Sequence, residues 1–235
     1  MQEQTTPIVF DKERASSYDG LYAKLAPLRE AIHLLIRVLL SGLPDDAHIL
    51  CIGVGTGAEL VDLAHEFPGW RFTAVEPTVP MMALCQKRAE ENGITDRCTF
   101  HEGYIDSLPK SEPFDAATSL LVSHFILTQE GQREYFARIA ARLRPGGSLI
   151  CSAIASDMSG AAYPNLLEAW LQMQRYTGVA EETVAKMPES YGRDISVLPP
   201  AQIEAIIAAS GFSAPVPFYQ ALLIHAWYAK RLPNI

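Results

Sequence analysis

Three glycines and one acidic residue form the group most able to do chemistry in this chain. Gly53, Gly55 and Gly57 directly follow an apolar run over 48–52, and Glu76 closes the next apolar run. Glycine has no Cβ, so the backbone can turn tightly and approach a ligand. A helix that starts there offers unpaired N–H groups. A carboxylate at the neighbouring strand tip can accept both hydroxyls of a ribose, so the pattern predicts a nucleoside cofactor.

The glycine pattern alone leaves three alternatives open. Gly53, Gly55 and Ala58 satisfy the dinucleotide pattern G-x-G-x-x-G/A, with an acid about 20 residues further on. The same run fits the G-x-G-x-G loop of an S-adenosylmethionine site. A strand–helix turn without a ligand is the third alternative, because a motif match is only a hypothesis.

The elements that must position these residues alternate along the chain. We expect strands over 48–52, 71–76, 98–102, 114–120 and 148–154, and helices over 57–66, 79–92 and 129–143. This alternation implies a parallel sheet with right-handed crossovers. A further helix is expected over 200–210, followed by an antiparallel strand pair over 213–220 and 221–230.

Three segments after the glycine loop carry a family resemblance. They are a strand end and turn over 100–109, a buried strand opening into a loop over 114–124, and Leu-Arg-Pro-Gly-Gly over 143–147, read as the end of a helix. In this order the chain resembles the class I S-adenosylmethionine-dependent methyltransferases, and 206–212 resembles their last helix and turn. The resemblance implies a single α/β domain over 1–235. Its fold would be Rossmann-like and doubly wound, with a mostly parallel seven-stranded sheet and an antiparallel last strand.

The resemblance also implies S-adenosyl-L-methionine as cofactor. The glycine loop should face its methionine part and ribose, Glu76 should hold the ribose hydroxyls, and Leu120 should pass near the methionine chain. Met81 lies where the family places an apolar residue against adenine, although a core methionine is an equal alternative. The expected cofactor residues are Gly53, Val54, Gly55, Thr56, Gly57, Glu76, Pro77, Met81, Gly103, Tyr104, Ile105 and Leu120.

Two residues depart from the family pattern. Cys51 stands where an acid often precedes the first glycine by two residues, and Tyr104 stands where an Asp often bonds the adenine amino group. The first change removes a contact to the cofactor amine. The second leaves adenine to backbone groups and aromatic packing.

Methyl transfer from a sulfonium is an in-line displacement, so the protein must align the reactants and exclude water. A base is needed only where the acceptor carries a proton. The candidate catalytic residues are Tyr18, which would fold over the cofactor, His124, which could be a base, and Arg175, which could meet an anionic substrate. The alternatives are that Tyr18 packs on the core, that His124 is a structural histidine and that Arg175 is a solvated helix residue.

Two segments could cover the site. Residues 1–43 read as an N-terminal helical cap, and 158–199 read as a helical insertion after the fifth strand, with helices over 166–176 and 181–187. Both would lie at the sheet edge where ligands bind in such folds. The alternative is an ordinary surface helix pair. The apolar face of the insertion would pack on the core or on a second subunit, so a homodimer is one expectation.

Composition excludes several classes of protein. The net charge of −8 disfavours a broad nucleic-acid surface. No apolar run reaches the roughly 20 residues of a membrane helix, and the N-terminus lacks signal-peptide regions, so a cytoplasmic location is expected. The four cysteines form no C-x-x-C pair and no zinc spacing, so no metal is expected.

The sequence therefore predicts an enzyme that transfers a methyl group to a small-molecule acceptor. The inserted segment and the chain's ending are also similar to carboxy-S-adenosylmethionine synthase, which keeps a cofactor-modifying enzyme as an alternative. Two further alternatives are a non-catalytic cofactor-binding protein and, less favoured by the sequence, an NAD-dependent dehydrogenase.

Overall fold

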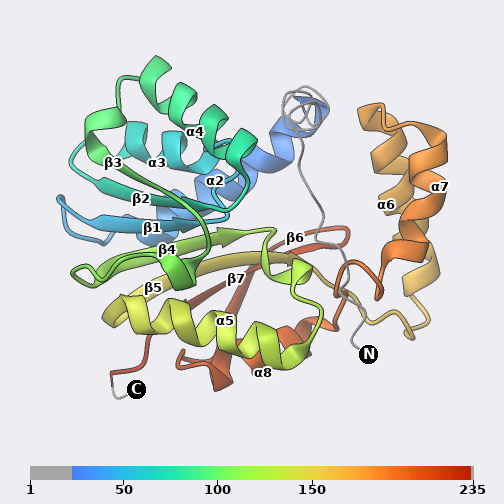
Figure 1. Cartoon of the computed structure of the whole chain (residues 1–235). Helices are drawn as coiled ribbons and strands as arrows, with labels where there is room; N and C mark the ends of the chain where they lie inside the picture. The colour runs from blue at the N-terminus through green and yellow to red at the C-terminus, as the bar shows by residue number, and fades with distance from the viewer. Residues whose placement is uncertain (1–22, 234–235) are drawn as a thin grey trace.

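The computed structural model describes residues 23–233, which form one twisted sheet with helices on both faces and a helical pair to one side (Figure 1). The strands are β1 His48–Ile52, β2 Arg71–Glu76, β3 Cys98–Glu102, β4 Phe114–Leu120, β5 Leu143–Ile154, β6 Val216–Ala221 and β7 Ile224–Lys230. The α-helices are α2 Ala26–Leu40, α3 Ala58–Glu66, α4 Val79–Glu91, α5 Gln129–Arg142, α6 Tyr163–Thr177, α7 Glu181–Ser190 and α8 Pro200–Ala209. Short 3-10 turns are η1 Ala23–Leu25, η2 Thr95–Arg97, η3 Ile105–Ser107 and η4 Ser123–Phe125.

The sheet has the order β3-β2-β1-β4-β5-β7-β6. All neighbours up to β5 pair in parallel, whereas β7 is antiparallel to both β5 and β6. The predicted seven-stranded sheet with an antiparallel last strand is therefore confirmed. The strand order reverses between β1 and β4, and open α/β sheets bind ligands outside the carboxyl ends of the strands at that point.

Alternate residues of the central strands supply two separate cores. Ile49 and Cys51 of β1 face the core built with α2, α3 and α4, whereas Leu50 and Ile52 face the core built with α5 and α8. This period of two is the pleat of a strand, and its burial on both faces explains why β1 reads as a continuous apolar run. The sheet is thus fixed from both sides, and its carboxyl edge is a rigid base for loops.

One boundary prediction is wrong. Residues 143–147 do not end a helix but belong to β5, because α5 stops at Arg142 and Leu143 already pairs with Phe114 of β4. Gly146 donates to the carbonyl of Arg231 at 3.0 Å and Arg231 donates to that of Gly147 at 2.8 Å. A partner near the chain's end, which local patterns do not reveal, thus makes the segment extended.

The helices α6 and α7 stand beside the sheet rather than on it (Figure 1). Their return segment is tied to the sheet edge, since Ser196 donates to the carbonyl of His124 at 2.8 Å and Ser156 to that of Leu198 at 3.0 Å. Within the pair, the Trp170 indole donates to the Tyr191 hydroxyl at 2.6 Å. Both predicted helices exist, and each is longer than predicted.

Candidate active site

The glycine loop turns through three left-handed residues. The φ angles of Gly53, Gly55 and Gly57 are 62°, 55° and 80°. Gly53 and Val54 both donate to the carbonyl of Val75 on β2, at 2.8 and 3.2 Å. The neighbouring strand thus sets the shape of the loop before any ligand binds.

Two of these glycines also sit where a side chain would collide. A Cβ on Gly53 would lie 2.4 Å from Cγ2 of Val122, and one on Gly57 would lie 2.7 Å from Sγ of Cys85. A Cβ on Gly55 would meet only the Gly53 carbonyl oxygen, at 4.0 Å. Gly55 is therefore the position where the loop is open to an approaching molecule.

Glu76 lies at the tip of β2 beside this opening. Its side chain is buried, and its two oxygens accept from different backbone groups: Oε2 from the N–H of Gly55 at 3.1 Å and Oε1 from the N–H of Thr78 at 3.0 Å. An ionised carboxylate has about four lone-pair sites. Each oxygen therefore keeps acceptor capacity for one ribose hydroxyl while the backbone holds the group in place.

The start of α3 contains the predicted residue Thr56 and one residue, Glu59, that the sequence analysis missed. Thr56 is buried, and its hydroxyl accepts from the Arg88 guanidinium of α4 at 3.0 Å. Glu59, in the first turn of α3, is 8% exposed, and burial raises the pKa of its carboxyl to about 7. The sequence signal for Glu59 was its place on the buried stripe of α3 with Leu60, Leu63 and Ala64.

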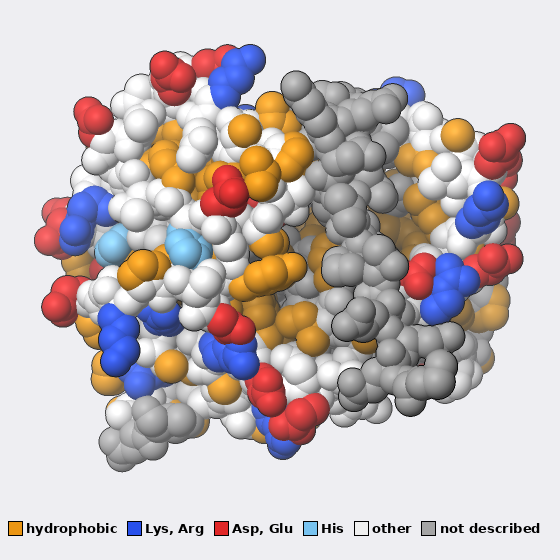
Figure 2. All heavy atoms as spheres, in the orientation of Figure 1, with side chains coloured by type: hydrophobic (Ala, Val, Ile, Leu, Met, Phe, Trp, Pro, Cys, Tyr) orange, Lys and Arg blue, Asp and Glu red, His pale blue; other side chains and the backbone are white. Residues whose placement is uncertain are grey.

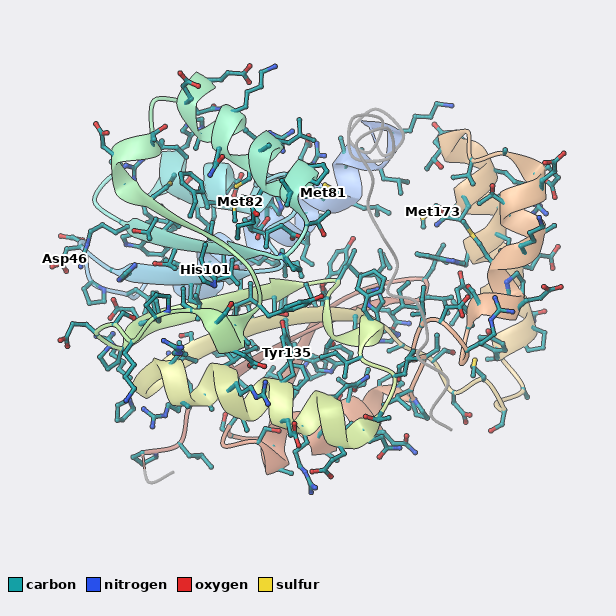
Figure 3. All side chains as sticks on the ribbon, viewed as in Figure 1. Asp46, Met81, Met82, His101, Tyr135 and Met173 are labelled. Atoms are coloured by element: carbon teal, nitrogen blue, oxygen red, sulfur yellow. The ribbon has the colours of Figure 1, made fainter. Side chains whose placement is uncertain are left out.

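The residues expected around adenine separate into buried and exposed ones. Met81 and Ile105 are buried, whereas Tyr104 is 64% exposed and Pro77 is exposed. Gly103 donates to the Glu76 carbonyl at 3.0 Å, which keeps this turn beside Glu76. Figure 3 shows Met81 at the start of α4, on the side of the body toward α6. The buried setting of Met81 fits the alternative of a core methionine.

The end of β4 is held in a strained turn. Leu121, which follows Leu120, has a φ of 57°, a conformation that costs a non-glycine residue on the order of 1–2 kcal/mol. Its N–H donates to both the carbonyl and the hydroxyl of Ser152 on β5, at 2.9 and 3.0 Å. Backbone strain of this kind gathers at functional sites. The turn brings Val122 against Gly53, so the β4 end and the glycine loop form one wall.

His124 is the candidate base at this wall. It is buried, and burial lowers the pKa of its imidazole to about 4. The N–H of Ile154 lies 3.5 Å from Nδ1, which leaves Nε2 as the nitrogen that carries the proton. At neutral pH the ring is uncharged. It is therefore better suited to donate a hydrogen bond from Nε2 than to act as a strong base.

Of the other two candidates, only Arg175 is among the described residues. The guanidinium of Arg175 on α6 pairs bidentately with Glu181 at 2.7 and 2.8 Å, which uses its fork for a surface ion pair. Tyr18 lies outside the described residues. Within residues 23–233, no helix is long and apolar enough to cross a membrane, and no group of three or more acidic, His or Cys side chains could hold a metal.

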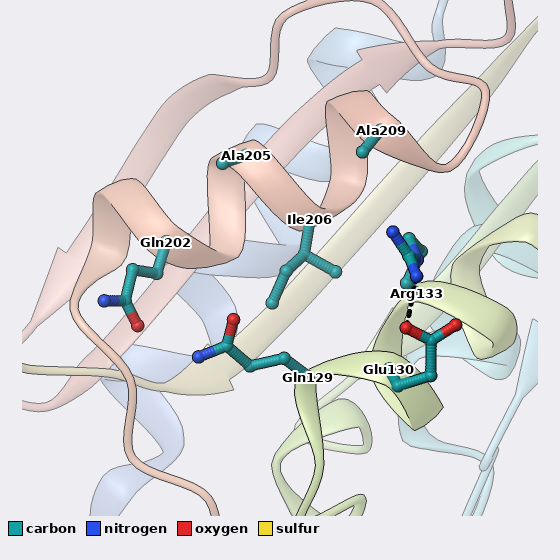
Figure 4. Close-up of a pocket in the computed structure, with 7 residues that line it drawn as sticks. All are labelled: Gln129, Glu130, Arg133, Gln202, Ala205, Ile206 and Ala209. Carbon is teal, nitrogen blue, oxygen red and sulfur yellow. Dashed lines mark hydrogen bonds and ion pairs between the residues drawn. The ribbon is translucent and has the colours of Figure 1, made fainter.

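A hollow lies between α5 and α8 (Figure 4). It is lined by Gln129, Glu130, Arg133, Gln202, Ala205, Ile206 and Ala209. Arg133 forms an ion pair with Glu130 of its own helix. None of the lining residues belongs to the glycine loop, so this hollow is separate from the candidate active site.

Comparisons with known proteins agree with this geometry. Residues 49–147, from β1 to the glycines of β5, match the family model described as a methyltransferase domain. The chain is 28% identical to erythromycin 3''-O-methyltransferase of Saccharopolyspora erythraea over 60% of this chain, and it spans 48% of that relative's length. It is 27% identical to demethylmenaquinone methyltransferase of Roseiflexus over 89% of this chain and 90% of the relative.

A solved structure from Nostoc punctiforme, titled a putative O-methyltransferase, shares the fold. The two superpose with a TM-score of 0.66 at 14% identity, over 90% of this chain and 60% of the other. The predicted resemblance is thereby confirmed. The methyltransferase-domain match, the glycine loop at the reversal of strand order and the antiparallel β7 together support a place for the chain among the class I S-adenosylmethionine-dependent methyltransferases.

Proposed function

We propose that this protein transfers the methyl group of S-adenosylmethionine to a small-molecule acceptor. The observation that carries the proposal is the Glu76 carboxylate, which is buried, fixed by two backbone N–H groups and placed beside the open Gly55. This arrangement suits a nucleoside with two free ribose hydroxyls.

The charges near the loop argue against a dinucleotide. In that alternative, an anionic pyrophosphate would sit at the start of α3 and depend on the positive end of the helix. Here the buried acid Glu59 occupies the first turn of this helix, and Glu76 lies next to it. Glu76 would bind a ribose in either alternative, whereas an acid at the helix start disfavours a pyrophosphate there and favours a cationic nucleoside.

The residues contribute alignment and exclusion of water. The sulfonium supplies an already activated methyl group, so the chain's own task is to orient donor and acceptor. Gly53–Gly57 and Glu76 would hold the donor, with Leu120 along its chain. His124, neutral and at the end of β4, would direct the acceptor through its Nε2–H.

The acceptor pocket would be completed by the insertion and the N-terminal cap. The return segment of the insertion is bonded to His124, and α6 lies against η1, where the Lys24 ammonium donates to the Tyr176 carbonyl at 2.9 Å. Figure 3 shows Met173 on the side of α6 that faces the sheet body. A closed lid would keep water from the methyl group.

The chemistry of two relatives supports a small-molecule acceptor. Their names specify erythromycin and demethylmenaquinone as substrates, and neither is a nucleic acid or a protein. The acidic charge of −8 is in keeping with this class. The homodimer and the cytoplasmic location stay predictions.

Calorimetry with S-adenosylmethionine, S-adenosylhomocysteine and NAD tests the cofactor. We expect the first two to bind and NAD to give no heat of binding. Mass spectrometry of any nucleoside that co-purifies should show S-adenosylmethionine or its demethylated product. Binding of NAD alone would reject the proposal, and a carboxylated nucleoside would replace methyl transfer by cofactor modification.

Hydrogen exchange tests the lid. On binding S-adenosylhomocysteine, we expect slower exchange in α6, in the segment 191–198 and in η1, in addition to the glycine loop. Protection confined to the glycine loop and Glu76 would show that the insertion is purely structural.

A further inference from the structure

We propose that Glu59 is a second acidic group of the cofactor site, placed beneath the glycine loop to favour a positively charged sulfonium nucleoside over its neutral product. This inference rests on the proposed function. Glu59 follows Gly57 by two residues and is 8% exposed, although most surface helices turn such a side chain to solvent. Burial of a carboxylate is costly, and a backbone N–H at the start of α3 and the Arg88 charge offset only part of that cost for Glu59.

Groups from three elements surround this carboxyl. Cys51 on β1 and Cys85 on α4 are buried thiols, and both feel the Glu59 charge, which adds to the effect of burial in raising their pKa. Since a Cβ on Gly57 would touch the Cys85 sulfur, the loop and α4 are in contact at this point. Glu59 therefore lies in the layer directly under the loop.

Among residues 23–233, Glu76 on β2 and Arg88 on α4 are the charged groups that act on Glu59. Glu76 disfavours a second negative charge, whereas Arg88 favours it, and burial outweighs both influences on the Glu59 pKa. The Arg88 guanidinium also donates to the Thr56 hydroxyl at 3.0 Å. Glu59 therefore lies close to a basic residue of α4 that contacts the glycine loop as well.

A cation bound at the loop changes this balance. S-adenosylmethionine carries a sulfonium charge that S-adenosylhomocysteine lacks, and an opposite charge close by favours the ionised carboxylate. Glu59 would release its proton to solvent when the charged nucleoside binds, and would keep it with the neutral product. The site would thus hold the donor more tightly than the spent product, and more so as the pH rises.

Calorimetric titrations of the whole protein at pH 5.5 and 8.5 would measure this preference. The ratio of the two affinities should rise with pH about tenfold more in the unmodified protein than in Glu59→Gln. The amino groups of the ligands titrate alike in both proteins, so this difference isolates Glu59. Glu66→Gln is the matched control, because it removes an exposed acid from the same helix and should keep the unmodified pH dependence.

A direct measurement covers the case in which Glu59→Gln does not fold. In protein labelled with ¹³C at glutamate carboxyls, one resonance should titrate near neutrality with S-adenosylhomocysteine and at lower pH with S-adenosylmethionine. Equal titration in the two complexes, or an equal affinity ratio in Glu59→Gln, would overturn the inference alone. If neither nucleoside binds the unmodified protein, the proposed function fails and this inference fails with it.

Discussion

The glycine-loop half and the insertion half of this molecule are built in opposite ways. Around the loop, Gly53, Val54 and Gly55 are fixed by β2, and Glu76 and Glu59 are buried. In α6 and α7, the buried side chains are only Trp170, Gln174, Thr177 and Val184. The glycine loop is anchored to the sheet by many internal contacts, whereas the insertion is bonded to the body through its return segment and through η1.

This difference indicates a division of labour. A loop that is already ordered loses little conformational entropy when a cofactor binds. A helical pair with little buried surface opens at low cost in free energy, which would suit the proposed lid. In Figure 2, hydrophobic side chains gather in the middle of the face viewed, where the body and the helical pair approach each other. The predictions below weaken one half at a time.

Gly53→Ala should have the largest effect. Its φ of 62° costs alanine on the order of 1–2 kcal/mol, and the collision with Val122 adds roughly 1–3 kcal/mol. Urea unfolding should show this loss together with loss of cofactor binding. Gly55→Ala shares the backbone cost but meets nothing closer than 4.0 Å, and Gly42→Ala has nothing within 4 Å. Equal stability of the three variants would refute the close packing of the loop.

His124 should make stability depend on pH. Its pKa is about 4 in the folded protein and 6.5 when unfolded, so the unfolded chain binds a proton first. The stabilisation is complete above pH 6.5 and is lost as the pH falls towards 4, on the order of 3 kcal/mol. Glu59 makes the opposite contribution to the pH dependence of stability. Its raised pKa favours the folded state below pH 4.5, and this contribution is lost as the pH rises to about 7.

Urea unfolding between pH 4 and 8 would separate these two contributions. His124→Gln should reduce the loss on acidification, to which the lowered pKa values of His33, His48 and His225 also contribute. His65→Gln, at an exposed position of α3, should retain the full loss. If His124→Gln follows the unmodified protein across this range, the imidazole is not protected from water. It could then be charged at working pH.

Glu76→Ala should weaken cofactor binding by roughly 1.5–3 kcal/mol, which is the worth of a hydrogen bond to a charged group. Glu102 is its matched control, because it faces Glu76 across the β2–β3 register at the same sheet edge and is exposed. Glu102→Ala should leave calorimetric affinity unchanged. Equal losses in both variants would mean a general charge effect, and no loss in either would remove Glu76 from the site.

The sequence predicted the glycine-loop half well because its signals are local. A strand, three glycines and an acid fix β1, the loop and β2 within about 30 residues, and each strand of the parallel set was placed correctly up to β4. The extended 143–147 segment was missed because its partner is Arg231, far along the chain. Glu59 was missed because burial of an acid depends on α4 and β1 packing around it.

The insertion half was predicted only as two helices. Whether Met173 or Arg175 faces the site depends on how α6 is rotated against its neighbours, and residue periodicity does not give that rotation for a helix with so little burial. Arg175 illustrates the problem. Its partner Glu181 follows it by six residues, across the Gly178 turn that joins α6 to α7. An ion pair across a turn leaves no periodic pattern in the sequence.

Substitution of Arg175 should therefore have the smallest effect on binding and activity. It also gives the sharpest test of the insertion half. Because both partners are exposed, the ion pair contributes little to stability. Since Glu181 occupies the guanidinium fork, Arg175→Gln and Glu181→Gln should each keep cofactor affinity and acceptor kcat/KM within about twofold. The measurement is steady-state kinetics with any acceptor that turns over. If Arg175 instead binds an anionic acceptor, Arg175→Gln should lower kcat/KM by about tenfold or more, because a bidentate contact is lost. Glu181→Gln should then raise it, because the fork is released. Opposite effects of the two variants would indicate that α6 is part of the acceptor pocket. Equal and small effects would indicate that the ion pair only links α6 to α7.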